Sequence, residues 1–212
     1  MTKEQALEKK LEQVKWQFPN HVVFKHNNRV YHFDPNNFNE ESIFSQTGLK
    51  VFNEKGSGIA FYNPEYFGVD VWGDLKYKGT ATERIPQPIN LKNYRWMFDG
   101  CKCEAINLSD WDFSEVISMY NMFGDSSAKT VILGDIDLNM CKGLTNCFEW
   151  CADLEELKLG AYKVSQDADV NDMFRNCIKL MKKYNKTKEE LADIFKSGQW
   201  NSLQQVKKMG AF

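Results

Sequence analysis

Six cysteines are the residues of this chain with the clearest capacity for metal or redox chemistry. Two close pairs, Cys101-x-Cys103 and Cys147-x-x-x-Cys151, have spacings at which thiolates can hold a zinc ion. Each cysteine also occupies one column of a regular repeat, however, where it is explained as a small buried hydrophobic residue. We therefore predict no metal, no cofactor and six reduced thiols in a cytosol-like compartment. A disulfide between neighbouring repeats is the alternative, and it needs an oxidising compartment.

Three histidines, His21, His26 and His32, lie close together in the chain, and histidine is the commonest general base of enzymes. A general base acts on a nucleophile or acid held beside it, and no sequence motif supplies such a partner for these histidines. The sequence also lacks the nucleotide-binding motif G-x-x-x-x-G-K, the esterase motif G-x-S-x-G and the zinc-protease motif H-E-x-x-H. The pattern therefore favours surface histidines and a protein that is not an enzyme. An enzyme with its site in the N-terminal region is the less favoured alternative.

Carboxylates are distributed unevenly along the chain. Residues 97–172 contain fifteen Asp and Glu against five Lys, whereas residues 173–212 contain nine Lys and Arg against three Asp and Glu. Within the acidic region, Asp110 and Asp135 are 25 residues apart, and so are Asp112 and Asp137. If 25 residues form one repeat, each pair lies about 5 Å apart in adjacent repeats, and its repulsion costs on the order of 1 kcal/mol.

The two aspartate pairs differ in what can offset this repulsion. Asp112 and Asp137 precede predicted helical turns, where an N-cap carboxylate accepts backbone N–H groups. No such role is evident for Asp110 and Asp135. A solvated charged face is the simpler interpretation, and a binding surface for a basic partner is the alternative. The candidate binding residues are the four aspartates and their neighbours on the predicted strands: Asp110, Asp112, Asp135, Asp137, Asn107, Ile132, Glu156 and Lys158.

A repeat of about 25 residues positions all of these side chains. Each repeat contains one phenylalanine at the same position, within four variants of one short motif: MFDGC at 97, MFGDS at 122, CFEWC at 147 and MFRNC at 173. Residues at the same position of successive repeats form a column. Between anchors, the spacing L-x-x-L-x-L ends in an alternation typical of a short strand with one buried face. Apolar residues three apart then lead into the next anchor, which is helical or 3₁₀ spacing. Each unit is thus predicted as strand, turn and helical turn, and stacking of units buries its apolar side.

Residues 106–126, INLSDWDFSEVISMYNMFGDS, resemble the BspA-type leucine-rich repeats, whose signature runs roughly L-x-x-L-x-L-S-x-W-D-T-S-x-V-x-x-M-x-x-M-F-x-x-C. The resemblance covers about residues 89–181, and later copies are looser, with Ile136 and Tyr162 at the position of Trp111. It implies a leucine-rich-repeat-like solenoid. It also implies kinship with adhesive modules of bacterial surface proteins and with intracellular and viral proteins. Because the chain shows no signal peptide, lipobox or wall anchor, an adhesin role is not carried over.

The N-terminal segment has a different pattern. Thr2 and Gln5 form a capping box for a helix that Pro19 ends. Residues 22–33 alternate about Asn27-Asn28, a pair that accepts the positive φ angles of a tight hairpin turn. Two further strands are expected, at residues 59–62 and 69–77.

The C-terminal segment loses the repeat, and Thr187 and Glu190 form a capping box for one more helix. The predicted fold class is α+β, in which a leucine-rich-repeat-like solenoid of roughly 25-residue coils occupies residues 89–181. A small N-terminal α+β cap at 1–88 and a C-terminal helical cap at 182–212 close its two ends.

These features predict a soluble, cytoplasmic, non-catalytic protein–protein interaction module, since no signal peptide or membrane span is evident. Its partner is expected to be a protein with a basic surface; direct binding of nucleic acid or membrane is not expected, because an acidic face repels phosphate. The sharpest form of the hypothesis is an inhibitor of a basic nucleic-acid-handling protein, encoded by a phage or mobile element. The alternative is a structural or adhesive scaffold in a virion or surface assembly. The chain is expected to be a monomer or small oligomer.

Overall fold

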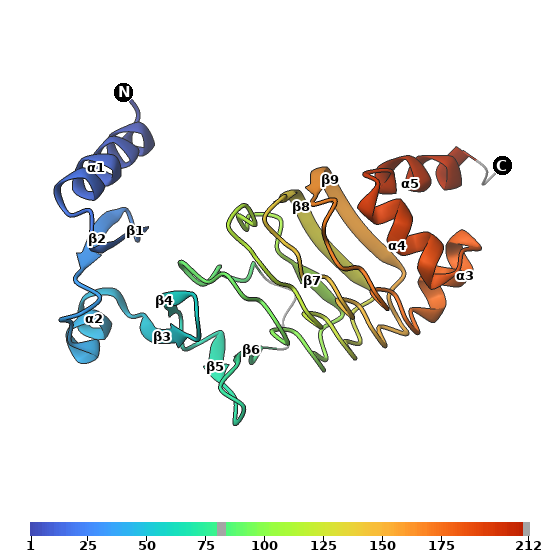
Figure 1. Cartoon of the computed structure of the whole chain (residues 1–212), viewed down its shortest axis with the longest axis horizontal. Coiled ribbons are helices and arrows are strands. Elements are labelled where there is room, and N and C mark those ends of the chain that lie inside the picture. The colour runs from blue at the N-terminus through green and yellow to red at the C-terminus, as the bar shows by residue number, and fades with distance from the viewer. Residues whose placement is uncertain (80–83, 210–212) are drawn as a thin grey trace. The chain divides into compact units, whose positions relative to one another are not determined.

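The structure is a computed structural model that describes residues 1–79 and 84–209. Residues 80–83 and 210–212, which belong to the expected divisions 1–88 and 182–212, lie outside the described residues. The chain divides into two compact units (Figure 1). The first contains residues 1–64 and 88–91, and the second contains residues 65–87 and 92–212.

The first unit is built from two antiparallel hairpins and two helices. The predicted first helix is confirmed, because Thr2 Oγ1 accepts the backbone N–H of Gln5 while the Gln5 side chain accepts that of Thr2. The first hairpin is confirmed too, with φ values of 47° at Asn27 and 59° at Asn28. In chain order the elements are α1 (Lys3–Gln17), β1 (Val22–His26), β2 (Arg29–Phe33), α2 (Glu40–Thr47), β3 (Lys50–Glu54) and β4 (Gly58–Tyr62).

The core of the first unit forms around Phe24, Ile43, Leu49 and Phe61, all buried. The rings of Phe24 and Phe61 lie 4.6 Å apart and join β1 to β4. Phe61 also exchanges two backbone hydrogen bonds with Ile89, with N···O distances of 2.9 and 2.8 Å, and so ties residues 88–91 into this unit. Helix α2 and strand β3 were not predicted from the sequence, because they contain only two and one buried residues, too few to show a period.

The second unit combines one hairpin, one parallel sheet and three helices (Figure 1). The strand predicted at 69–77 is in fact a hairpin, because Asp70 Oδ1 accepts the backbone N–H groups of Trp72 and Asp74, each at 2.9 Å, and closes a tight turn. The elements are β5 (Phe67–Val69), β6 (Leu75–Tyr77), β7 (Ala105–Asn107), β8 (Thr130–Leu138), β9 (Glu156–Val164), α3 (Ile178–Tyr184), α4 (Lys188–Lys196) and α5 (Trp200–Met209).

The phenylalanines of the repeated phrase form a continuous stack in the core of the second unit. The ring centroids of Phe98 and Phe123 are 5.5 Å apart, those of Phe123 and Phe148 4.9 Å, and those of Phe148 and Phe174 5.5 Å. The loops that carry the rings bond to one another through their backbones. Phe98 N donates to Met122 O at 2.7 Å, and Phe148 N donates to Met173 O at 2.9 Å. The 25-residue spacing therefore marks residues that contact one another through space.

The prediction of a leucine-rich-repeat-like solenoid with two caps is wrong. The fold is α+β, with short antiparallel hairpins and one small parallel sheet of three strands, which are 3, 9 and 9 residues long. The segments expected to be helical turns before Phe123 and Phe148 are non-helical turns. Left-handed residues such as Asn121 and Asn146 interrupt any helix there, and their N–H groups donate to the adjacent loop. The N-terminal residues form a unit with a core of its own.

The C-terminal helices close one end of the phenylalanine stack. Trp200, fully buried at the start of α5, stacks on Phe174 with ring centroids 5.3 Å apart, and its Nε1 donates to Leu157 O at 2.9 Å. The capping box of Thr187 and Glu190 at the start of α4 is confirmed. None of the helices within the described ranges combines the length and the apolar composition that a membrane span requires.

Candidate functional site

Three of the candidate binding residues predicted from the sequence lie side by side on the parallel sheet. Asn107, Ile132 and Lys158 are register partners across β7, β8 and β9. The neighbouring row of Ile106, Val131 and Leu157 is buried, so the candidate row faces the other side of the sheet. Glu156 lies two residues before Lys158 on the same face, and the Glu156 Oε2 to Lys158 Nζ distance is 3.0 Å.

Glu156 belongs to the ion-paired part of this surface. The hydrogen bond from Lys158, followed by the charges of Lys158 and Lys183, lowers the pKa of the Glu156 carboxyl below its usual range despite partial desolvation. The second ion pair joins Glu156 Oε1 to Lys183 Nζ at 3.7 Å. Glu156 and Lys158 therefore satisfy each other and offer a partner little net charge.

Asp110 and Asp135 each have a partner that stabilises the carboxylate, which was not evident from the sequence. Asp110 pairs with the exposed Arg84, and Asp135 Oδ1 accepts the backbone N–H of Ala161 at 2.8 Å. The two backbones approach closely just before these residues, where a Cβ on Gly134 would lie 2.7 Å from Ser109 O. The arginine and the N–H group thus offset the repulsion expected between the two carboxylates.

Asp112 and Asp137 cap turns, but the turns are not helical. Asp112 Oδ1 accepts the N–H of Ser114 at 2.9 Å, and Asp137 Oδ1 accepts that of Asn139 at 3.0 Å. This is the turn that Asp and Asn side chains form with the backbone two residues later. The predicted capping role is correct in its chemistry, whereas the predicted helical context is wrong.

The basic C-terminal segment neutralises a large part of the acidic region. Lys179 Nζ lies 3.0 Å from carboxylate oxygens of both Asp153 and Glu155, and Arg175 Nε lies 3.3 Å from Glu149 Oε1. Further pairs are Lys183 with Glu156 and Lys188 with Asp172. Among the side chains of residues 1–79 and 84–206, by contrast, no ion pair holds Asp112, Asp135 or Asp137. We call Asp110, Asp112, Asp135 and Asp137 the acidic edge.

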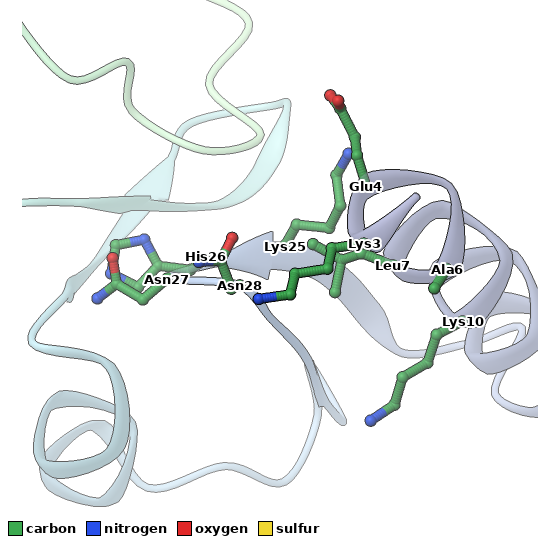
Figure 2. A pocket seen from close by; sticks show the side chains of 9 residues that line it. All are labelled: Lys3, Glu4, Ala6, Leu7, Lys10, Lys25, His26, Asn27 and Asn28. Atoms are coloured by element: carbon green, nitrogen blue, oxygen red, sulfur yellow. The ribbon is translucent and has the colours of Figure 1, made fainter. Parts of the chain in front are cut away.

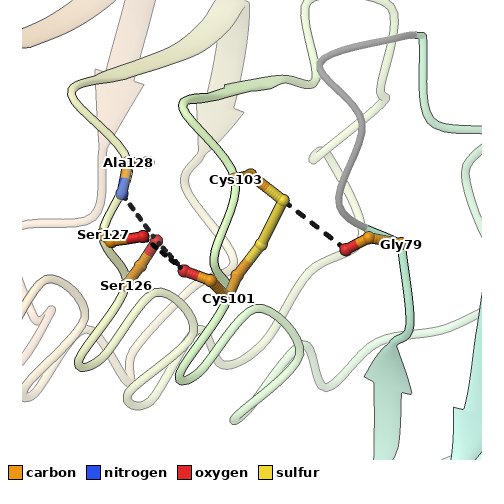
Figure 3. Close-up of a disulfide and its surroundings, with 6 residues drawn as sticks. All are labelled: Gly79, Cys101, Cys103, Ser126, Ser127 and Ala128. Carbon is orange, nitrogen blue, oxygen red and sulfur yellow. Dashed lines mark hydrogen bonds between the residues drawn. A yellow bond between two sulfur atoms is a disulfide. The ribbon is translucent and has the colours of Figure 1, made fainter.

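The cysteines do not all behave alike. Cys101 and Cys103 are joined in a disulfide, with Cys103 Sγ 3.6 Å from Gly79 O (Figure 3), so the prediction of six reduced thiols is wrong for this pair. The other four are free and buried: Cys141, Cys147, Cys151 and Cys177. Burial raises the pKa of Cys141 to about 11 and that of Cys151 to about 12, so these thiols stay protonated and act as core residues. The described residues contain no cluster of three or more His, Cys, Asp or Glu that could hold a metal ion.

A hollow of the first unit lies between α1 and the β1–β2 turn and has a volume of about 800 Å³ (Figure 2). Lys3, Lys10 and Lys25 line it together with His26, Asn27 and Asn28, and Lys25 also pairs with Glu8. His26 Nε2 lies 3.1 Å from the backbone oxygen of Thr47.

The other two histidines bond to each other. His21 Nδ1 lies 3.0 Å from His32 Nδ1, and the ring of Phe18 stacks on His32 at 4.2 Å. This is a packed surface cluster and not a base held beside a nucleophile. The enzyme alternative in the N-terminal region stays a hypothesis.

Two tryptophans that the sequence analysis did not single out line a separate pocket of the second unit. Trp72 and Trp96 share it with Asp70, Asp74, Lys76 and Asp99. A signal for them was present in the repeat itself, because Trp96 stands in a column where the later loops have Asn121, Asn146 and Asp172.

The comparison with protein families assigns most of the second unit. The family model described as "Mycoplasma protein of unknown function, DUF285" matches residues 92–210. Neither a curated protein nor a solved structure matches the chain. Because the matched residues make up more than half of the sequence, the chain belongs to this family.

Proposed function

We propose that this chain is a non-catalytic binding module whose acidic edge takes a protein partner with a basic surface. The observation that carries the proposal is a contrast among carboxylates. Glu149, Asp153 and Glu155 are matched by cations of the C-terminal segment, while three of the four aspartates of the acidic edge have no ion pair within the described residues. A charge left unmatched at the surface is available to a partner.

The way these aspartates are held also supports binding. In Asp112, Asp135 and Asp137, the Oδ1 atom accepts one backbone N–H, which fixes the carboxylate while the second oxygen keeps its capacity to accept. A guanidinium group needs a carboxylate in a fixed orientation for its strongest hydrogen bonds. The acidic edge is therefore better prepared for arginine than carboxylates on long, mobile side chains are.

The sequence likeness favours binding over catalysis as well. Residues 106–126 resemble the BspA-type repeat phrase, and that resemblance links the chain to adhesive and interaction modules. Proteins that handle nucleic acids present Arg and Lys to phosphate groups, so they are the partner class whose surface best matches the acidic edge. A scaffold that binds further copies of itself is the second candidate, and the test below separates the two.

The test measures binding of a fluorescent arginine-rich peptide by anisotropy, at low and at high salt. The edge variant combines Asp110→Asn, Asp112→Asn, Asp135→Asn and Asp137→Asn, because asparagine keeps the oxygen that accepts each backbone N–H. The matched control combines Glu104→Gln, Glu149→Gln, Asp153→Asn and Glu155→Gln, which changes the net charge equally at carboxylates that already have a cation.

We expect the edge variant to bind at least about fourfold more weakly, since four exposed ion pairs of about 0.2–1 kcal/mol each sum to about 0.8–4 kcal/mol. The control variant is expected to bind like the wild type, and salt is expected to weaken the wild-type complex. Equal losses in both variants would show a general charge effect and remove the acidic edge from the function. Concentration-dependent self-association in light scattering, unchanged in the edge variant, would favour the scaffold.

A further inference from the structure

The tip of the β5–β6 hairpin holds an exposed tryptophan on an ordered turn. Asp70 Oδ1 accepts the N–H groups of Trp72 and Asp74, and Asp70 N donates to Asp74 O at 2.9 Å. The Trp72 side chain is nevertheless 84% exposed, whereas Trp111 and Trp200 of the same unit are buried. An indole held in water by a turn with its own hydrogen bonds contributes nothing to the core, and such a side chain suits recognition.

Trp96 occupies a backbone position that does not suit it. Its φ is 60°, in the left-handed region, and the corresponding residues of the later loops are Asn121, Asn146 and Asp172, with φ values of 50°, 59° and 51°. Asn and Asp adopt this conformation at low cost, whereas a bulky aromatic residue is strained there. The fold is satisfied with Asn or Asp at this position in three loops, and Trp150, outside the pocket, shares the conformation with a φ of 61°. A role of Trp96 in recognition therefore follows from the pocket that it lines and not from its backbone alone.

The two tryptophans meet at a pocket of about 420 Å³, a size within the range of about 300–1,000 Å³ typical of small-molecule sites. Asp70, Asp74, Lys76 and Asp99 complete its lining. The aromatic faces and fixed polar groups form one concave site built from residues of the second unit.

Three of the four charged side chains in this pocket, Asp74, Lys76 and Asp99, already have side-chain partners, whereas Asp70 Oδ1 accepts two backbone N–H groups. Lys76 Nζ lies 3.1 Å from Asp99 Oδ2 and 5.9 Å from the centre of the Trp96 ring. Asp74 Oδ1 accepts from Arg95 Nε at 2.7 Å, and Asp99 Oδ1 accepts from Asn121 Nδ2 at 2.7 Å. A cationic guest would have to displace Lys76 from both the indole and the carboxylate. The pocket therefore favours a neutral ligand that combines an apolar face with several hydroxyl groups.

We propose that this pocket binds a neutral carbohydrate. The exposed indole of Trp72 supplies a face on which the C–H side of a sugar ring packs, and the Trp96 indole, with Lys76 Nζ 5.9 Å from its centre, lines the pocket beside it. The Asp74 and Asp99 carboxylates accept hydrogen bonds from hydroxyl groups, and the Lys76 ammonium donates to a hydroxyl or ring oxygen. The pocket shares no residue with the acidic edge, so carbohydrate binding is tested independently of the proposed function.

The test is a titration of the full chain with methyl glycosides of glucose, galactose, mannose and N-acetylglucosamine and with their linear oligosaccharides, followed by calorimetry and tryptophan fluorescence. At least one oligosaccharide is expected to bind with a Kd of about 1 mM or tighter. Trp72→Ala is expected to weaken this binding about tenfold or more, because it removes a stacking face while the turn keeps its Asp70 hydrogen bonds. Trp150→Ala, at another half-exposed tryptophan outside the pocket, is expected to leave it unchanged.

Trp96→Asn separates recognition from folding. Asparagine suits the left-handed backbone, so the variant is expected to keep or raise the unfolding midpoint and to lose sugar binding about tenfold or more. If none of the sugars binds at about 1 mM, if Trp72→Ala binds as the wild type does, or if a trimethyllysine peptide binds in the pocket more tightly than every sugar, the proposal is overturned.

Discussion

Phe148 is the residue whose truncation tests the packing of the second unit most directly. Its side chain is fully buried, and its ring lies parallel to those of Phe123 and Phe174, with interplanar angles of 2° on both sides. Phe148→Ala is expected to lower the free energy of unfolding by about 3–5 kcal/mol, the range for a buried phenylalanine. We expect the upper half of that range, because each lost ring pair adds about 0.5–1.5 kcal/mol.

Two matched variants divide this effect into its parts. Phe148→Leu keeps most of the volume and loses both ring pairs, so it is expected to cost about 1–3 kcal/mol. Ile178→Ala removes a side chain that is 56% exposed in the same unit, and it is expected to cost less than about 1 kcal/mol.

Urea unfolding followed by tryptophan fluorescence measures these differences. Five of the six tryptophans lie in the second unit, so a Trp16→Phe background makes the signal specific for that unit. Because whole domains have stabilities of about 5–15 kcal/mol, the Phe148→Ala protein is expected to unfold at a much lower urea concentration. A loss for Phe148→Ala no larger than that for Ile178→Ala would refute the reasoning and with it the stacked arrangement of the loops.

Three further measurements test the acidic edge, the thiols and the ion pairs. Asp135→Ala is expected to lower the unfolding free energy by about 1 kcal/mol, because it removes the acceptor of the Ala161 N–H, and urea unfolding that finds no loss would contradict this bond. Thiol titration without reductant is expected to count almost no reactive cysteine in the native chain, four in denaturant and six after reduction; six in denaturant alone would disprove the Cys101–Cys103 disulfide. The folded state lowers the pKa of Glu156, so the stability it contributes is complete above its unfolded pKa and disappears as pH falls through the folded one. The gap between the wild type and Glu156→Gln, less than about 1 kcal/mol at neutral pH, is therefore expected to narrow in urea unfolding once the pH falls below the unfolded glutamate pKa of about 4.3 and to close as it falls further through the lowered folded pKa.

Local features could be predicted from the sequence because neighbouring residues determine them. The capping boxes at Thr2 and Thr187 and the Asn27-Asn28 turn depend on side chains within three residues of the backbone groups they satisfy. The phenylalanine contacts could be predicted as well, since a constant spacing brings equivalent residues of successive loops side by side. Asp112 and Asp137 were recognised as caps for the same local reason.

The tertiary structure alone decided the rest, because long-range partners leave no local pattern. Apolar residues three apart indicated helical turns, but the N–H groups of these segments donate to the next loop, and left-handed residues such as Asn121 exclude a helix. The ion pair of Asp110 with Arg84 and the bond of Asp135 to Ala161 join residues 26 positions apart in the chain, so no short window could reveal them. The pocket of Trp72 and Trp96 likewise exists only where the β5–β6 turn meets the first loop of the repeat, and the sequence pattern alone contained neither that meeting nor its hollow.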